Sequence, residues 1–214
     1  MRHQQVENIE NLKERFTNQK KFILKAGAIF LAILLITLGF YTYSVKKQND
    51  AKELEYEAYK YYFGLIKNSE LTEQQRMQKA AELFIEAYNK KSNLTYLMNA
   101  GYAYEMAGQR DKAIETLRKV VNTSDPYFTN LARVKIAMIH LKNNEQTLAV
   151  NLLNEILNDK SDTMKDFSLF QLAKIYEQNN PEEANKYYDS LIRKFPESPF
   201  AQSAKNKIKE SEKK

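Results

Sequence analysis

The chain starts with a polar stretch, passes through one unbroken apolar run, and continues with apolar residues that recur every three or four positions. The run from Ala26 to Val45 holds twenty residues without a charged side chain, and lysines stand on both sides of it. A helix rises about 1.5 Å per residue and satisfies its own backbone polar groups, so a run of this length crosses the roughly 30 Å hydrocarbon layer once. The pattern predicts a transmembrane helix over residues 22–45, in contact with membrane lipid.

Other interpretations of the apolar run fit less well. A cleaved secretory signal has a shorter apolar core and small residues before its cleavage site, whereas this run ends in Gly39-Phe40-Tyr41-Thr42-Tyr43. A buried core helix needs only one apolar face, and this run is apolar on all sides. The chain has no cysteine, which excludes a lipid anchor on that residue. We therefore interpret the run as an uncleaved signal anchor.

Charge favours a cytoplasmic N-terminus. Five Lys or Arg side chains lie within the twenty residues before the run and four within the twenty after it, and positive flanks favour the cytoplasm. The apolar positions of the N-terminal tail recur at spacings of three and four, which predicts a short amphipathic helix against anionic lipid or a partner; a solvated tail is the alternative. These positions are Val6, Ile9, Leu12 and Phe16.

Beyond the run, the pattern is helical throughout. This part has only three glycines and four prolines, and no alternating strand pattern competes with the helical one. A similar pair recurs at intervals of 33, 36 and 35 residues: an alanine early in an expected helix, followed four positions later by a bulky apolar residue. The alanines are Ala80, Ala113, Ala149 and Ala184, and the bulky residues are Phe84, Leu117, Leu153 and Tyr188.

The best-formed unit runs from Asn93 to Pro126. Small residues at Gly101 and Ala113 let its two helices approach closely, while Tyr104 and Leu117 fill the space around them. This unit resembles the tetratricopeptide repeat family. The matching residues are Leu97, Ala100, Gly101, Tyr104, Gly108, Ala113, Leu117, Val120 and the stop at Asp125-Pro126.

Two further units match the family in part. One has His140 in place of the usual tyrosine and Asn144 in place of the turn glycine, and the last ends at Pro196. The resemblance implies an all-α chain, in which the transmembrane helix is followed by an α-solenoid of three to four hairpins and a C-terminal capping helix. An ordinary helical bundle is the alternative. The expected segments are 1–21 (cytoplasmic basic tail), 22–45 (transmembrane), 46–92 (membrane-proximal helices and a degenerate repeat), 93–199 (repeats) and 200–214 (cap and tail).

Composition argues against nucleic-acid binding and offers little to catalysis. Half of the net charge of +6 belongs to residues 1–25, and the rest of the chain alternates Lys and Glu as solvated helix faces do. Two histidines, no cysteine, no H-E-x-x-H, no phosphate loop and no G-x-S-x-G leave no catalytic pair or metal cluster. We expect a protein without enzymatic activity, metal or cofactor, in which His140 is a packing residue.

A groove is the expected functional feature. In stacked hairpins the first helices line the concave face, and we expect a protein partner there. Repeats that bind a peptide carboxylate use Lys, Arg and Asn at such positions, but this set is mostly Met, Val and aromatic, which suits an apolar segment or partner helix. Coverage by the chain's own C-terminal helix or by a second copy is the alternative. The expected groove residues are Met98, Asn99, Tyr102, Val134, Lys135, Met138, Phe170, Gln171 and Lys174.

The layout of the whole chain is similar to that of the YfgM-like ancillary subunits of the Sec translocon, which are single-pass proteins of the bacterial inner membrane. Glu7 to Phe16 in the tail, Ala58-Tyr59 after the anchor and Thr123-Ser124-Asp125 between repeats take part in this similarity. It implies a cytoplasmic N-terminus, a periplasmic repeat domain, and association with translocon subunits and periplasmic chaperones. The alternatives are a periplasmic chaperone that binds unfolded clients, and a non-catalytic subunit of an enzyme complex.

Overall fold

The computed structural model describes residues 2–66 and 70–211; among the first eighteen residues, it describes the side chains of Arg15 and Thr17 alone. Within these residues the chain forms nine α-helices and no strand. It divides into two compact units, Met1–Asp50 and Ala51–Lys214.

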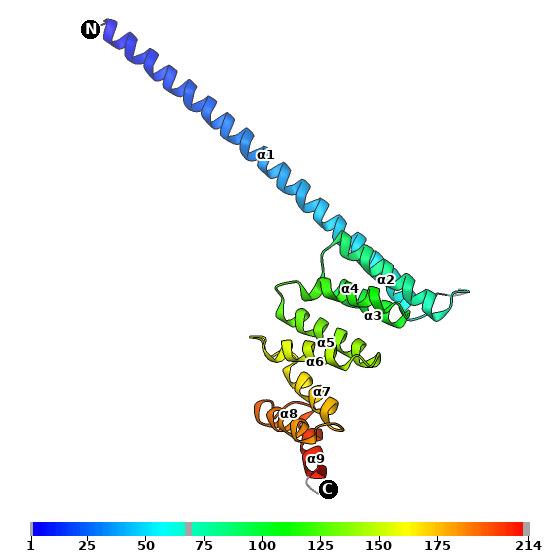
Figure 1. Ribbon diagram of the computed structural model, residues 1–214. Helices are drawn as coiled ribbons and strands as arrows, with labels where there is room; N and C mark the ends of the chain where they lie inside the picture. Colours follow the sequence, from blue (N-terminus) through cyan, green and yellow to red (C-terminus); the bar gives the residue numbers. More distant parts are fainter. Residues whose placement is uncertain (1, 67–69, 212–214) are drawn as a thin grey trace. The chain divides into compact units, whose positions relative to one another are not determined.

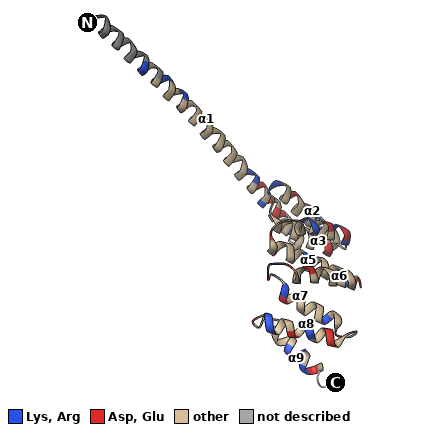
Figure 2. Ribbon diagram, turned by 60° about the vertical axis from the view of Figure 1, so that its left-hand side comes forward, with Lys and Arg blue, Asp and Glu red and all other residues tan. Residues whose placement is uncertain are grey.

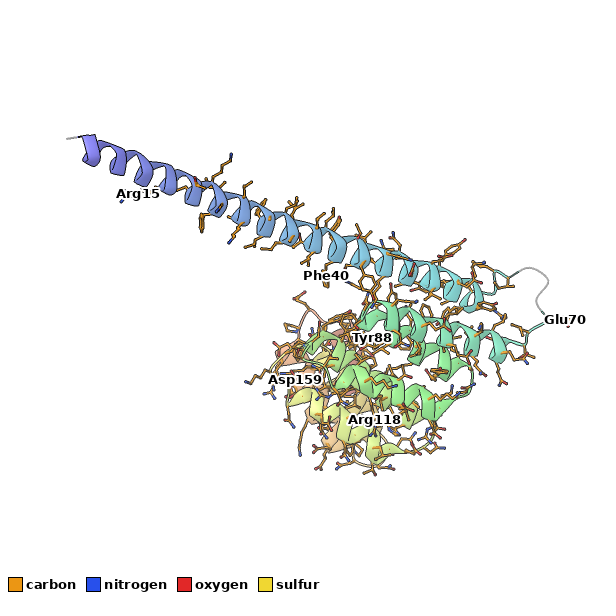
Figure 3. All side chains as sticks on the ribbon, turned by 90° about the horizontal axis from the view of Figure 1, so that it is seen from above. Arg15, Phe40, Glu70, Tyr88, Arg118 and Asp159 are labelled. Carbon is orange, nitrogen blue, oxygen red and sulfur yellow. The ribbon has the colours of Figure 1, made fainter. Side chains whose placement is uncertain are left out.

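The first unit is part of one helix, α1 (Arg2–Tyr62), whose last turns belong to the second unit. Its uncharged stretch, tan throughout in Figure 2, buries none of its side chains, and Phe40 is 75% exposed (Figure 3). The hydroxyls of Thr37 and Thr42 each donate to the carbonyl three residues earlier, at 2.9 and 3.0 Å, so both are paired inside the helix. By length and composition this helix can cross a membrane once.

The tail positions Val6, Ile9, Leu12 and Phe16 are part of α1. Their side chains lie outside the described residues. The amphipathic face of the tail therefore stays a prediction.

The second unit is a stack of helical hairpins (Figure 1). The end of α1 pairs with α2 (Glu73–Lys90), where the rings of Tyr59 and Phe84 meet edge to face at 5.1 Å. This arrangement confirms the predicted fold, an all-α solenoid with a capping helix. The other elements are α3 (Leu94–Met106) with α4 (Arg110–Val121), α5 (Pro126–Lys142) with α6 (Gln146–Leu157), α7 (Lys165–Tyr176) with α8 (Pro181–Lys194), and α9 (Ala201–Ser211), which closes the stack.

The repeat interval read from the sequence is confirmed by burial. The four alanines lie in the second helix of each hairpin and are at most 2% exposed, and the bulky residues four positions later are equally buried. Residues four apart share one face of a helix, so each pair turns a small and a large side chain toward the same neighbours. That combination lets the second helix pack against the first of its own hairpin and of the next.

The turns between paired helices use a left-handed residue in three hairpins. Gly64, Gly108 and Asn144 have φ of 67°, 74° and 60°. In each case the following amide donates to a carbonyl five residues earlier, at 2.8 to 2.9 Å, as in a Schellman turn. Asparagine is among the few non-glycine residues that adopt this conformation readily. This explains why Asn144 can replace the glycine of the repeat.

A polar network joins α5 to the loop before α7. Asn130 is fully buried and donates to the carbonyl of Thr163 at 3.3 Å, while Arg133 donates to Asn130 at 2.9 Å and to Asp159 at 3.2 Å. The backbone amide of Ser161 is the main cause that lowers the pKa of Asp159, with Arg133 adding to it. Sequence periodicity does not predict this network, because it links polar residues far apart in the chain.

Gly101 lies where α3 and α4 come closest. A Cβ atom built at Gly101 would stand 2.6 Å from Cγ of Leu117, and Leu117 is fully buried, so it has little room to move. The predicted close crossing is therefore present. At Gly64 the nearest atom to a built Cβ is the guanidinium of Arg76, at 2.6 Å, which ends a flexible side chain.

We expect Gly101→Leu to destabilise the second unit by about 1 to 3 kcal/mol or more, because the added side chain overpacks a filled crossing. Gly64→Leu should destabilise the second unit less. The left-handed backbone at this position costs a leucine about 1 to 2 kcal/mol, but the Arg76 guanidinium can move aside and make room for the side chain. Thermal unfolding of the full-length protein in detergent compares the two variants. Equal melting temperatures for both would contradict the close crossing at Gly101.

Candidate functional site

The nine residues expected to line the groove fall on the first helices of three hairpins, three each on α3, α5 and α7. Helices α3 and α5 are in direct contact, so the residues on these two helices lie on neighbouring elements. Their surroundings differ from one residue to the next. They form two groups, one packed in the core and one at the surface.

Met98 and Val134 are core residues, contrary to the expectation of a groove lining. Met98 is 2% exposed and belongs to the core cluster of the first three hairpins, and Val134 is 9% exposed and belongs to the cluster formed by α5, α6 and α7. Neighbouring residues on a helix point about 100° apart, so a step of one position moves a side chain from the surface into the core. Asn99 and Lys135, each one position later, are only partly buried.

Asn99 and Lys135 are bonded within the chain. The Asn99 amide donates to the hydroxyl of Tyr59 at 2.9 Å. The Lys135 ammonium forms an ion pair with Glu105 and also lies 4.6 Å from the centre of the Tyr102 ring. Lys142 reaches the other oxygen of Glu105 at 3.8 Å. The polar groups of this face therefore bind one another.

A cluster of tyrosines stands beside these pairs. Burial raises the pKa of Tyr102, and the nearby phenols of Tyr127 and Tyr62 and the Glu105 carboxylate raise it further. Tyr127 is 53% exposed, while Tyr62 and Tyr102 are partly buried. We call Tyr62, Tyr102 and Tyr127 the tyrosine patch. Sequence reasoning found only Tyr102, because the other two lie at a helix end and a helix start, outside the repeated positions.

Met138 is partly buried at the edge of the second core cluster, on the helix that carries Lys135. The partly buried Tyr62 and Tyr102 pack instead against the first core cluster. Met106, at the end of α3, is 47% exposed. Flexible Met and rigid Tyr side chains are common at protein-binding surfaces.

Phe170 does not extend this surface into the last hairpin. Its ring stacks on Phe200 at 5.0 Å and packs near Tyr188 at 6.0 Å, and Lys174 lies 5.9 Å from its centre. Phe200 immediately precedes α9, so the C-terminal segment covers Phe170. A single free strip through Tyr102, Met138 and Phe170 is therefore not formed, and Gln171 stands partly buried beside the covered part.

His140 packs in a polar cluster at the turn between α5 and α6. It is 6% exposed, and its Nδ1 donates to Glu145 at 2.6 Å. The Arg110 guanidinium forms an ion pair with the same carboxylate. Among the described residues no group of three or more His, Cys, Asp or Glu could hold a metal ion. The cluster ties the second hairpin to the third.

Comparison with known proteins agrees with the geometry of these hairpins. A model of the tetratricopeptide repeat-like domain matches residues 16–168, and one of the tetratricopeptide repeat matches residues 167–198. The chain belongs to the tetratricopeptide repeat-like domain family. No curated protein matches this repeat protein in sequence.

Solved repeat proteins share the fold at low identity. A kinesin light chain from Podosopora anserina with nearly identical TPR-like repeats is 18% identical, with a TM-score of 0.51 over 73% of this chain and 82% of that one. A point variant of the same protein gives 18% identity and 0.50 over the same shares. MamA is 17% identical over 65% of this chain and 92% of its own, with a TM-score of 0.46. The likeness to the kinesin light chain shows the fold of the repeats alone.

The cluster around His140 makes stability depend on pH. The hydrogen bond from His140 is the main cause that lowers the pKa of Glu145 from its ordinary value of 4.5, and Arg110 adds to the effect. The fold therefore favours the carboxylate form. The stabilisation that the Glu145 carboxylate gives the folded protein is complete above pH 4.5. It is lost as the pH falls through the lower pKa that Glu145 has in the folded state.

We expect Glu145→Gln to lower the urea midpoint of unfolding near neutral pH, with a difference from the parent protein that shrinks below about pH 4. Glu86→Gln, at an exposed position on α2, is the matched control and should leave the midpoint unchanged. A difference that stays constant down to acid pH would show that Glu145 does not act through its charge.

Proposed function

We propose that this protein is a membrane-anchored scaffold that docks other proteins on the first-helix face of its second and third hairpins. The observation that carries the proposal is the tyrosine patch with Met138. Of the two aromatic residues expected in the groove, Phe170 packs on Phe200, whereas Tyr102 packs against the first core cluster and Lys135. The fold supports it, since stacked repeats of this kind present extended surfaces to protein partners.

The anchor is proposed from α1. The uncharged stretch of α1 is long enough to span a bilayer, and none of its side chains is buried. Transfer of this stretch from water into lipid would lower its free energy. Lys20, Lys21 and Lys25 before it, and Lys46 and Lys47 after it, would stand at the two surfaces. The stronger positive flank favours a cytoplasmic tail, which supports the proposal that residues 46–214 lie in the periplasm of a bacterial cell.

The partners are proposed from the layout. A short basic tail, one anchor, a tyrosine-bearing helix and degenerate repeats are what the YfgM-like ancillary subunits of the Sec translocon have. We assign this protein to the same role, linking translocon subunits to periplasmic chaperones without catalysing a reaction. A client-binding chaperone is the rival function, and it predicts that the protein suppresses aggregation of an unfolded substrate.

Topology is the first test. A reporter that is active only in the cytoplasm, fused after Lys214, should be silent when the fusion is expressed in a Gram-negative bacterium. The same reporter fused before Met1 should be active, which controls for expression. An active reporter at the C-terminus would reverse the orientation and remove the periplasmic role.

Docking is the second test. Tyr102→Ser combined with Met138→Ser should reduce in-membrane crosslinking to translocon subunits about tenfold, which corresponds to about 1.4 kcal/mol of lost binding. Tyr56→Ser, which replaces a tyrosine 68% exposed on α1 and outside the patch, should leave the crosslinks intact.

Circular dichroism should show that the double variant keeps its fold. Phe170→Ser should instead lower stability, because Phe170 packs on Phe200. Unchanged crosslinking in the double variant would move the docking site to another face or to the cytoplasmic tail.

A further inference from the structure

The polar side chains of the proposed docking face form a closed set. The Asn99 amide and the Lys135 ammonium group, which could bind a partner's carboxylate, each already have a partner in this chain. Asn99 is bonded to Tyr59, and Lys135 to Glu105. The inference drawn from this rests on the proposed function, because it concerns what the same face accepts.

Glu105 is the centre of the set. Its side chain is 18% exposed, and each of its two carboxylate oxygens faces one lysine of the neighbouring hairpin. The Lys135 side chain is 26% exposed and is held between Glu105 and the ring of Tyr102. Lys142 is 73% exposed at the rim. An internal carboxylate thus occupies the place that an incoming carboxylate would need.

Two further charged side chains, Glu55 and Lys174, also make contacts within the chain. On the α1 side, Glu55 accepts a hydrogen bond from the hydroxyl of Tyr96 at 3.2 Å. On the α7 side, Lys174 lies over the covered ring of Phe170. An acidic ligand would meet Glu105 as a like charge and would have to displace it from both lysines. A neutral apolar ligand meets neither penalty and has the tyrosine patch to pack against.

We infer that Glu105 competes with the carboxylates of a ligand for Lys135 and Lys142. The face therefore selects an uncharged apolar segment of a partner and rejects acidic chain ends. Glu105 is thus a specificity-determining residue that acts by keeping Lys135 and Lys142 occupied. Removing its charge while keeping its shape opens a cation site on the face. The selected partner chemistry is a neutral segment rich in aliphatic or aromatic side chains.

The test uses the full-length protein in lipid nanodiscs and two fluorescent probe peptides of the same Leu- and Ala-rich sequence. One peptide ends in an amide, and the other ends in Asp-Asp with a free carboxylate. Fluorescence anisotropy measures both affinities. The parent protein should bind the amidated peptide at least tenfold more tightly than the acidic one, with little dependence on salt.

In Glu105→Gln the acidic peptide should gain about tenfold in affinity, and the gain should disappear in 1 M salt, where the screening length falls to about 3 Å. Adding Lys135→Gln to this variant should also abolish the gain. The matched control is Glu115→Gln, which removes the same charge from a side chain 72% exposed on α4 and paired with Lys119 inside its own helix. It should change neither affinity.

Two results would overturn the inference: a parent protein that prefers the acidic peptide, or a Glu105→Gln variant that gains no affinity for it, including the case in which no peptide binds. Neither result changes the expected crosslinks to translocon subunits, which test the proposed function separately. Loss of those crosslinks in the parent protein would reject the scaffold role while leaving the charge selectivity of the face measurable.

Discussion

The close approach of paired helices is the constraint on which the second unit depends. A buried alanine lies in the second helix of each hairpin, and the close crossing is shown at Gly101 against Leu117, where even one added carbon would collide. Because each helix also packs on the next hairpin, this spacing sets the position of every later element. The surface presented by the first helices is therefore a consequence of how tightly the second helices pack behind them.

Polar pairs also link neighbouring hairpins. Glu105 binds two lysines of α5, and Glu145 binds Arg110 and His140 across the turn before α6. Such partly exposed pairs contribute little to stability individually. In the proposed function they matter for binding, because each pair removes charged groups from the set that a ligand could use. A face with internally neutralised charges is suited to apolar recognition.

The two units differ in how much of their apolar surface is exposed. The uncharged part of α1 leaves its apolar side chains exposed, while Figure 2 shows Lys, Arg, Asp and Glu distributed over the helices of the second unit. The second unit buries its own apolar residues in three core clusters. Among the described residues, the second unit thus encloses its apolar side chains, and the uncharged part of α1 does not. This contrast is the physical basis for the proposed anchor and scaffold.

The sequence by itself determined the helical class, the hairpin interval and the close crossing at Gly101, since these follow from local periodicity and from the size of single residues. It also indicated Asn144 as the turn residue in place of glycine. Only the tertiary structure decided which first-helix residues reach the surface. Met98 and Val134 are core, Phe170 is covered by Phe200, and Lys135 is bound to Glu105. These outcomes depend on the rotation of each helix and on its register against the next hairpin, and no spacing within one helix specifies either quantity.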